Sequence, residues 1–285
     1  EIMPSLVGSE MCIRDSHKAV EVFENDVYVP IHVGKALHPN LELGFISDNI
    51  GDNISMKNPF YSELTAQYWA WKNLHSEYVG LCHYRRYFAT EYTNHNIEEE
   101  LDGYDVILAS SVAYPKSIFT RWENDLVNED VHIFYQYMIT RFPSQKNEID
   151  DFFIKNNRYN PANMFVCKKT LFDKFAEWQF SILFDLEKYI LSSEYSRPRR
   201  LFGYLSEGLL PFYMKLNGLR IKEVPLVPMI GSDQILFKNS FKFKIKNWLY
   251  FERKKNKYKY ELPDDVKCSL VNAGVFKKLQ NEFFK

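Results

Sequence analysis

An apolar run that ends in cationic and hydrogen-bonding side chains is the part of the sequence best suited to chemistry. Residues 77–88 read Glu-Tyr-Val-Gly-Leu-Cys-His-Tyr-Arg-Arg-Tyr-Phe, so that His83, Tyr84, Arg85 and Arg86 follow the apolar run. Arginine presents a planar fork of N–H donors that matches phosphate oxygens. Because ligands of open α/β sheets bind beyond the carboxyl ends of strands, the cluster predicts an anion pocket. The alternative is a structural arginine pair that bonds carboxylates and carbonyls beneath a sheet.

A buried strand is expected to position this cluster. Residues 79–82 are apolar or small and too few for a helix, which favours a strand covered on both faces. If the strand continued, alternation would send odd- and even-numbered side chains from His83 to Tyr87 to opposite faces. Other extended segments are predicted at 27–34 (or a loop there), at 104–110, at 164–167 after an Asn-Pro turn, and at 221–227 as a final edge strand.

Helices are expected between these strands. Residues 58–75 begin with Asn-Pro, where Asn suits the N-cap and Pro the first helical position, and continue with apolar residues at helical spacing. In this helix the pair Trp69 and Trp71 is interpreted as core rather than as a platform for sugars. Thr170 is expected to cap a long helix with one apolar stripe. Helical periodicity also marks 131–138 and 203–216.

Two further polar features suit ligand chemistry. Asp52 and Asn53 lie in the segment 46–55, which is dense in Asp, Asn and Gly. These are turn residues by default, and the functional alternative is that they hold ribose or sugar hydroxyls. Glu207 stands among apolar residues of the 203–216 helix. A buried carboxylate can have a raised pKa and act as a general base, although a lone helical Glu is more often the structural partner of an arginine.

Composition bounds the protein class. The chain has 285 residues, of which 46% are hydrophobic and 16% aromatic, enough for a sizeable α/β core. It contains no run of about 18 apolar residues of the kind that spans a membrane. A formal net charge of −1 argues against a globally basic nucleic-acid binder. Its four cysteines are far apart, without metal or redox spacing, which fits a reducing cytoplasm.

The first 16 residues resemble a translated sequencing adapter. They lack the cationic region and apolar core of a signal peptide. Their codons can be written as a tagmentation adapter that carries a sample index between fixed ends. We therefore exclude residues 1–16 from the fold and expect the natural N-terminus to be missing. A natural strand encoded upstream of His17 at the source locus would support this hypothesis, and an uninterrupted genomic match to residues 1–16 would contradict it.

The segment 238–259 combines nine basic residues and one acidic residue with several aromatic ones. This mixture suits an anionic membrane surface, where each cation contributes about 1 kcal/mol. Nucleic acid would be attracted for the same reason, and a solvated helical tail is the alternative. No repeat or low-complexity linker divides the chain. We therefore expect a main domain of residues 17–236 and a basic, aromatic C-terminal appendage of residues 237–285.

Several motifs together resemble a known bacterial family. They are Asp-Asn-Ile-Ser at 52–55, Glu-Leu-Thr-Ala-Gln-Tyr-Trp-Ala-Trp-Lys-Asn at 63–73, Gly-Leu-Cys-His-Tyr-Arg-Arg-Tyr-Phe at 80–88, Asn-Met-Phe at 163–165 and Phe-Gly-Tyr-Leu-Ser-Glu at 202–207. In this order they resemble the surface-polysaccharide glycosyltransferases catalogued as domain-of-unknown-function family 4422. The resemblance covers most of the chain from His17 to about Val227, and the His-Tyr-Arg-Arg-Tyr-Phe block is its most specific part.

The resemblance implies an α/β fold of the glycosyltransferase A type, a Rossmann-like mixed sheet flanked by helices. The implied reaction transfers a sugar from a UDP-sugar to a saccharide or polyprenyl-linked acceptor in capsule, O-antigen or exopolysaccharide synthesis. One branch is similar to inverting galactofuranosyltransferases, which makes galactofuranose the candidate sugar. The alternative function is a non-catalytic module that binds anionic polysaccharide or nucleic acid; under the favoured function nucleic acid is not a partner. The implied location is cytoplasmic, with peripheral membrane contact through Lys238–Lys259.

The same resemblance supplies candidate roles for single residues. Ordinary A-type enzymes carry a metal-binding Asp-x-Asp where this chain has the segment 83–86. Side-chain cations are expected to replace the metal there, so that no cofactor is needed; manganese and magnesium stay open as alternatives. Glu207 is the candidate base. The candidate donor-binding residues are His17, Lys18, Asp52, Asn53, His83, Tyr84, Arg85 and Arg86, and the candidate acceptor- or sugar-binding residues are Asn163 and Arg200.

Two departures from the family pattern bear on these roles. Gly208 stands where the family usually has an arginine, which weakens the expected charge partner of Glu207. The family also begins with a strand that leads into the His-Lys motif, and only His17 and Lys18 of it are present. The first strand of the fold is therefore expected to be missing or replaced by adapter-derived residues.

Overall fold

The structure is a computed structural model that describes most of the chain. It describes residues 8–13 (backbone only), 28–83, 86–191, 199–228, 245, 248, 249 and 259–283. The chain forms two compact units. The first comprises residues 1–111, 160–180 and 202–239, and the second comprises residues 112–159, 181–201 and 240–285.

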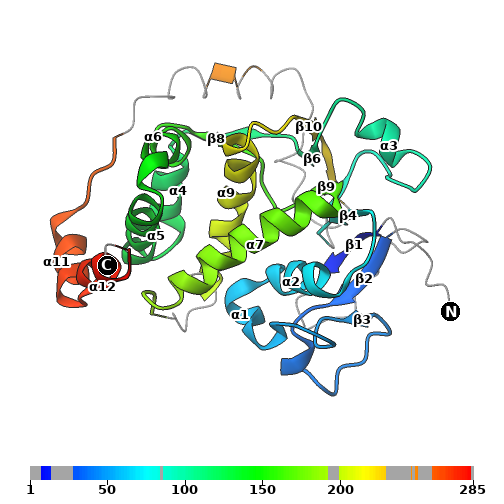
Figure 1. Cartoon of the computed structure of the whole chain (residues 1–285), viewed down its shortest axis with the longest axis horizontal. Helices are drawn as coiled ribbons and strands as arrows, with labels where there is room; N and C mark the ends of the chain where they lie inside the picture. Colours follow the sequence, from blue (N-terminus) through cyan, green and yellow to red (C-terminus); the bar gives the residue numbers. More distant parts are fainter. Residues whose placement is uncertain are drawn as a thin grey trace. The chain divides into compact units, whose positions relative to one another are not determined.

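A seven-stranded mixed sheet is the framework of the first unit (Figure 1). In spatial order its strands are β10 (Ile221–Val224), β6 (Val106–Ala109), β9 (Phe165–Lys168), β4 (Tyr78–Leu81), β1 (Gly8–Ile13), β2 (Tyr28–His32) and β3 (Ile46–Ser47). Only β9 runs antiparallel to its neighbours. The carboxyl ends of the other six strands and the start of β9 therefore meet at one edge of the sheet.

The central strands are covered on both faces, as predicted. Every residue of β4 and of β6 is buried. On one face, side chains such as Cys82, Ile107 and Val166 belong to an apolar cluster that includes residues of β5 (Arg86–Phe88), α3 (Ile97–Glu100) and β11 (Leu226–Pro228). On the other face, the ring of Phe165 in β9 stacks on that of Phe172 in the following helix, with 5.2 Å between their centroids. Apolar runs without polar alternation are therefore explained by burial from both sides.

The expected alternation beyond β4 is wrong, because the chain reverses there. The backbone N–H of Arg86 donates to the carbonyl of His83 at 2.9 Å, and these two residues form an antiparallel bridge. The following strand, β5 (Arg86–Phe88), leaves the main sheet and pairs antiparallel with β11 (Leu226–Pro228). The single edge strand predicted at 221–227 is likewise two strands, β10 and β11, in different sheets.

Residues 8–13 occupy a central position in the sheet. The strand β1 pairs in parallel with β2, where Ser9 lies opposite Tyr28, and with β4, where Gly8 lies opposite Val79. These residues belong to the segment expected to be adapter-derived. The position assigned to a missing first strand is thus occupied by β1. That these residues are adapter-derived and replace a natural strand stays a prediction.

The helices of the first unit depart from the prediction at their ends. In place of one helix over 58–75 there are two, α1 (Asn58–Tyr61) and α2 (Leu64–Asn73), separated by Ser62 at φ 51° and ψ −124°. Asn58 is the first residue of α1 rather than its N-cap, and its amide donates to the carbonyl of Ser62 at 3.0 Å. Thr170 does not cap the long helix α7 (Lys169–Leu186), which begins one residue earlier.

Aromatic contacts join these helices. Trp69 of α2 is buried, as the core interpretation predicts. Trp71 is half-buried and stacks on Phe180 of α7 with 5.8 Å between ring centroids. Tyr61 of α1 stacks at 4.8 Å on Phe202 of α9 (Leu201–Leu216), the helix predicted over 203–216. Short 3₁₀ helices span Lys35–Leu37, Ser55–Lys57 and Pro143–Gln145.

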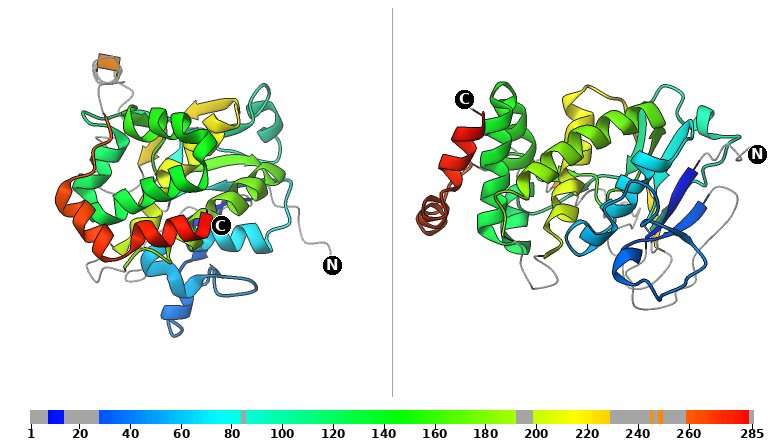
Figure 2. Two further views of the ribbon diagram at one scale, coloured as in Figure 1. Left: turned by 60° about the vertical axis from the view of Figure 1, so that its left-hand side comes forward. Right: turned by 60° about the horizontal axis from the view of Figure 1, so that its bottom comes forward.

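The second unit is mainly helical (Figure 2). Its elements are the antiparallel pair of strands β7 (Val112–Ala113) and β8 (Arg158–Tyr159), the helices α4 (Ile118–Asp125), α5 (Asn128–Arg141), α6 (Lys146–Ile149), α11 (Asp264–Asn272) and α12 (Val275–Phe283), and a π-helix at Asp150–Ile154. The helical period seen at 131–138 is confirmed by α5. Within the described residues, no helix is long and apolar enough to cross a membrane.

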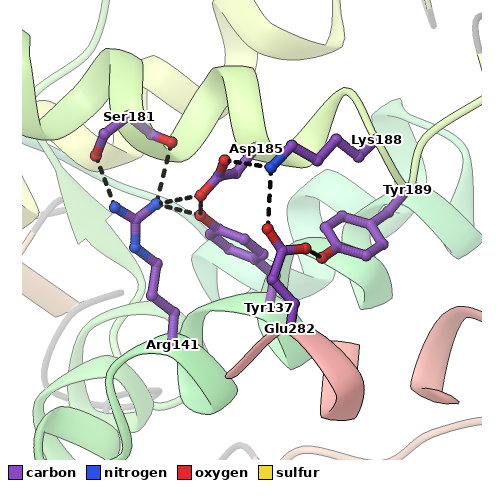
Figure 3. Close-up of polar contacts among 7 residues, drawn as sticks. All are labelled: Tyr137, Arg141, Ser181, Asp185, Lys188, Tyr189 and Glu282. Carbon is purple, nitrogen blue, oxygen red and sulfur yellow. Dashed lines mark hydrogen bonds and ion pairs between the residues drawn. The ribbon is translucent and has the colours of Figure 1, made fainter. Parts of the chain in front are cut away.

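Within the second unit, a polar network attaches the C-terminal helix α12 to residues of α5 and of the segment 181–189 (Figure 3). The carboxylate of Asp185 accepts hydrogen bonds from Tyr137 Oη, Arg141 Nη1 and Lys188 Nζ, each at 2.9 Å. Lys188 also donates to Glu282 of α12 at 2.9 Å, and Tyr189 donates to the same carboxylate. The described helices of the predicted appendage, α11 and α12, thus pack on α5, while the predicted domain boundary itself stays a prediction.

Candidate active site

Polar side chains gather at the carboxyl edge of the sheet in the first unit. His32 ends β2, His83 follows β4, Ser111 follows β6, and Asn163 precedes β9. Half-buried His83 is fixed to half-buried Arg86 by the reversal after β4. This edge is where α/β sheets bind their ligands. Four predicted donor-binding residues, His17, Lys18, Tyr84 and Arg85, lie outside the described residues.

Asn163 is the centre of a buried network that joins three of the sequence motifs. Its side chain is 1% exposed, and its amide nitrogen donates to Glu63 Oε1 at 2.7 Å and to the carbonyl of Gly203 at 3.1 Å. The hydroxyl of Ser206 lies 2.9 Å from Asn163 Oδ1 and 3.0 Å from Gln179 Oε1, and its one proton is donated to either acceptor. The network therefore ties the start of α2, the start of β9 and the first turns of α9 together.

Backbone strain is concentrated around the same network. In the described residues, the non-glycine residues with positive φ are Ser62 at 51°, Ala162 at 79° and Asn163 at 49°. The shortest hydrogen bond of the network joins Asn163 to Glu63. Positive φ values therefore occur on both sides of it, at Ser62 next to Glu63 and at Ala162 and Asn163. Such residues cost about 1–3 kcal/mol each and cluster at functional sites. The unusual backbone marks this junction as a candidate functional site.

Glu207 directly follows Ser206, which anchors α9 to the network. It is half-buried, in agreement with its apolar surroundings in the sequence. Hydrogen bonds from Asn163 to the Gly203 carbonyl and between Asn163 and the Ser206 hydroxyl fix α9 to the network. Glu207 is the next residue along this helix. The candidate base and Asn163 are therefore brought to one junction.

The loop that contains Asp52 and Asn53 is held by a residue that sequence reasoning missed. Asp48 is fully buried and accepts hydrogen bonds from the backbone N–H groups of Gly34 at 2.8 Å and Lys35 at 3.2 Å, and from the Ser55 hydroxyl at 2.5 Å. Gly34 has φ 66°, and a Cβ there would lie 2.9 Å from the Asn58 side chain, so glycine is required. The composition of the Asp/Asn/Gly-rich segment 46–55 predicts a turn, but it does not distinguish Asp48 from the other polar residues of the segment.

Asp52 is exposed and faces α2. It accepts a hydrogen bond from Tyr68 Oη at 3.1 Å, and burial, followed by this bond, raises the pKa of Tyr68 to about 12. Asn53 is used inside its own turn, donating to the carbonyl of Gly51 at 2.8 Å and accepting from the Ser55 N–H at 3.2 Å. The hydrogen bonds of Asn53 thus support its interpretation as a turn residue. Asp52 is exposed, as a carboxylate that binds sugar hydroxyls needs to be.

Glu223 is a second functional candidate that the sequence did not reveal. Its Oε2 accepts from the backbone N–H of Ser111 at 3.1 Å and from the Ser111 hydroxyl at 2.9 Å, and its Oε1 accepts from Asn160 Nδ2 at 3.1 Å. Asn160 also donates to the carbonyl of Ala109 at 2.7 Å. An exposed carboxylate is thus oriented by three donors at the carboxyl edge of the sheet.

Arg200 belongs to the second unit and is exposed just before α9. Its contact with a ligand stays a prediction. Among the described residues, no three His, Cys, Asp or Glu side chains are grouped so that they could hold a metal ion.

The solved structures that resemble this chain include a glycosyltransferase. The WbbM bifunctional glycosyltransferase, solved in its apo form, is 28% identical to this chain with a TM-score of 0.70. The match covers 79% of this chain and 45% of that one, so the chain spans less than half of the length of WbbM. This similarity confirms the predicted fold class, an A-type glycosyltransferase fold with a mixed sheet flanked by helices.

Family membership is shown by a family model, whereas the other comparisons add nothing to it. The Mn/GDP form of core-mannan synthase A from Aspergillus fumigatus is 11% identical over 76% of this chain and 57% of its own, and its TM-score of 0.30 carries no argument. No curated protein matches significantly. Residues 12–218 match the family described as domain of unknown function (DUF4422). Because the match takes in well over half of the sequence, the chain belongs to this family.

Proposed function

We propose that the chain transfers a sugar from a nucleotide-sugar donor to a saccharide or polyprenyl-linked acceptor in the synthesis of a bacterial surface polysaccharide. The observation that carries the proposal is the similarity to WbbM over 79% of the chain, in a protein whose own description is a bifunctional glycosyltransferase. That description applies to a longer chain, of which the match covers 45%. The strained junction at the carboxyl edge of the sheet supports an active site in this part of the fold.

The donor diphosphate is proposed to lie beyond β4. His83 and Arg86 are fixed to each other where β4 ends, and the side chains of Tyr84 and Arg85 complete the predicted cluster. Two guanidinium groups and an imidazole can neutralise a leaving diphosphate by charge-assisted hydrogen bonds. Transfer is therefore proposed to be independent of a metal ion, with His17 and Lys18 as further donor ligands.

Glu207 is proposed as the general base of an inverting transfer. Such a reaction needs a carboxylate within hydrogen-bonding reach of the acceptor hydroxyl, on the face opposite to the leaving group. Glu207 is half-buried, and the hydrogen bond of neighbouring Ser206 fixes its turn of α9 to the strained junction. The finer assignments, UDP as the nucleotide and galactofuranose as the sugar, rest on the family resemblance.

Attachment to the inner face of the cytoplasmic membrane is proposed for the segment Lys238–Lys259. Its described residues include Ile245 and Trp248, whose exposed fractions are 42% and 60%. Exposed apolar side chains among lysines are typical of a peripheral membrane contact. Lipid-linked acceptors would be found at such a surface.

Calorimetric titration of UDP and of UDP-galactofuranose, in EDTA and then in manganese, tests the donor site. We expect binding in EDTA that Arg86→Ala weakens by about tenfold to a hundredfold, the loss of one charge-assisted hydrogen bond or more. Arg220→Ala is the matched control, because Arg220 precedes β10 at the opposite edge of the sheet and is 63% exposed. Binding that requires manganese would contradict metal independence, and the absence of binding in both conditions would contradict the proposed donor site.

A further inference from the structure

The second unit contains a pocket that the proposed transfer reaction does not use. Its volume is about 380 Å³, within the usual range for small-molecule sites. The walls come from α5, α6, the π-helix and residues 259–260, all of which belong to the second unit. Apolar groups of Ile139 and Ile154 line it beside the rings of Tyr135 and Tyr260.

Among the described residues, the lysines that line the pocket outnumber their carboxylate partners by one. Three lysines line it, and two of them have carboxylate partners: Lys146 pairs with Asp150, and Lys155 pairs with Asp151 at 2.6 Å. Among the described residues the third, Lys259, forms no ion pair. Lys259 is exposed and lies next to Tyr260. A ligand with one negative charge would therefore complement the pocket better than a polyanion, which the carboxylate of Asp150 would repel.

Hydrogen-bonding groups in the pocket are positioned in advance. Asp150 Oδ1 accepts from the hydroxyl of Tyr135 at 2.7 Å and keeps further acceptor capacity. Gln136 Nε2 donates to the hydroxyl of Tyr260 at 3.0 Å. The same hydroxyl lies 2.9 Å from Nδ1 of buried His132, so the position of the Tyr260 ring is fixed by two hydrogen-bonding partners. The rings of Tyr135 and Tyr260 stack with their centroids 4.0 Å apart.

The π-helix gives this wall its shape. The N–H of Lys155 donates to the carbonyl of Asp150 at 2.9 Å, five residues earlier, so that the turn is wider than an α-helical one. Both ends of this wide turn, Asp150 and Ile154, line the pocket. Single π-turns are rare and frequently occur at functional sites. The backbone irregularity is thus a second observation, independent of the lysines, that marks the pocket.

We propose that this pocket binds a uronic acid, a sugar whose carboxylate pairs with Lys259. The ring carbons of such a sugar would pack on the isoleucine and tyrosine side chains, its hydroxyls would donate to Asp150, and its single negative charge matches the one lysine in excess. The inference concerns the second unit alone and does not depend on the transfer reaction or on its donor site.

Titration of the full chain with D-glucuronate, D-glucose and inorganic phosphate, followed by saturation-transfer NMR and calorimetry, tests the proposal. Lys259→Met should weaken glucuronate binding about fivefold, the upper effect of an exposed ion pair, without unfolding the chain. The matched control is Lys267→Met, the same change at an exposed position of α11 that does not line the pocket. Thermal denaturation of both variants checks that folding is unchanged.

Saturable glucuronate binding that is weakened by Lys259→Met and not by Lys267→Met supports the proposal. Glucose binding of equal strength would overturn it, because the carboxylate would then contribute nothing. Phosphate binding of equal strength would overturn it as well, because the sugar body would not be recognised. The absence of glucuronate binding, or equal effects of the two substitutions, would also overturn it.

Discussion

Replacing Asn163 measures how strongly the buried junction is held. Its side chain bonds the Glu63 carboxylate at 2.7 Å, the Gly203 carbonyl at 3.1 Å and the Ser206 hydroxyl at 2.9 Å. A buried hydrogen bond to a charged group is worth about 1.5–3 kcal/mol and a neutral one about 1 kcal/mol. The substitution Asn163→Gly removes all three and is expected to lower the free energy of unfolding by about 4 kcal/mol.

The backbone contribution can be separated by a second substitution at the same site. Asn163 has φ 49°, in the left-handed region that glycine and asparagine tolerate. Asn163→Ala loses the same hydrogen bonds and adds the cost of placing a Cβ in this region, about 1 kcal/mol. The alanine variant should therefore be the less stable of the two, although alanine is normally the more stabilising residue.

Urea unfolding followed by far-UV circular dichroism and tryptophan fluorescence measures both effects. Asn272→Ala is the control, since Asn272 is exposed in α11 and its replacement is expected to change stability by less than about 0.5 kcal/mol. A loss below about 1 kcal/mol for Asn163→Gly would refute the network as a stabilising element. An alanine variant as stable as the glycine variant would refute the backbone argument.

Three other perturbations have expected outcomes that urea unfolding can check. Asp48→Asn replaces a fully buried carboxylate that accepts three hydrogen bonds, so it should cost about 2–4 kcal/mol; an unchanged midpoint would contradict its anchoring role. Burial raises the pKa of Asp130 to about 7, so its protonated form is favoured on folding, and the stability this confers is present below pH about 4 and lost as the pH rises to about 7. Asp130→Asn should accordingly gain stability relative to wild type as the pH rises from 5 to 8. The gain should be less than about 4 kcal/mol, because the start of α5 favours the charged form of Asp130. A stability difference that does not change with pH would contradict this expectation. Asp185→Asn weakens three hydrogen bonds and should lower the free energy of unfolding by about 2–3 kcal/mol. Glu282→Gln, at the edge of the same network, should lower it by less than about 1 kcal/mol. The reverse order would contradict the network drawn in Figure 3.

Elements with strong local signals could be predicted from the sequence. The strands β4, β6 and β9 were expected because short apolar runs are bounded by turn residues, and α5 and α7 because their apolar residues recur at helical spacing. Errors fell at boundaries. The break at Ser62 and the reversal after His83 depend on contacts with distant segments, and neither position carries the Gly or Pro that normally signals a turn.

The site was only partly accessible to the same reasoning. The motifs located Ser206 and Asn163, but nothing in the sequence shows that their side chains meet, because the bond joins residues 43 positions apart. Glu223 was invisible for the same reason, since its partner Ser111 lies 112 positions away. Asp48 resembles any turn aspartate until its burial is known. Long-range partners decide the role of each of these residues, and a single sequence does not contain them.

Sugar transfer by the protein encoded at the source locus, with Glu207→Gln as the comparison, tests the proposed function and its candidate base together. UDP release from UDP-galactofuranose is followed in EDTA with a lipid-linked or saccharide acceptor. We expect transfer by the wild-type protein, a rate about a hundredfold to ten-thousandfold lower for Glu207→Gln, and equal donor affinity for both. Donor binding without transfer by the wild type would contradict an enzyme, and an unchanged rate in the variant would contradict Glu207 as its base.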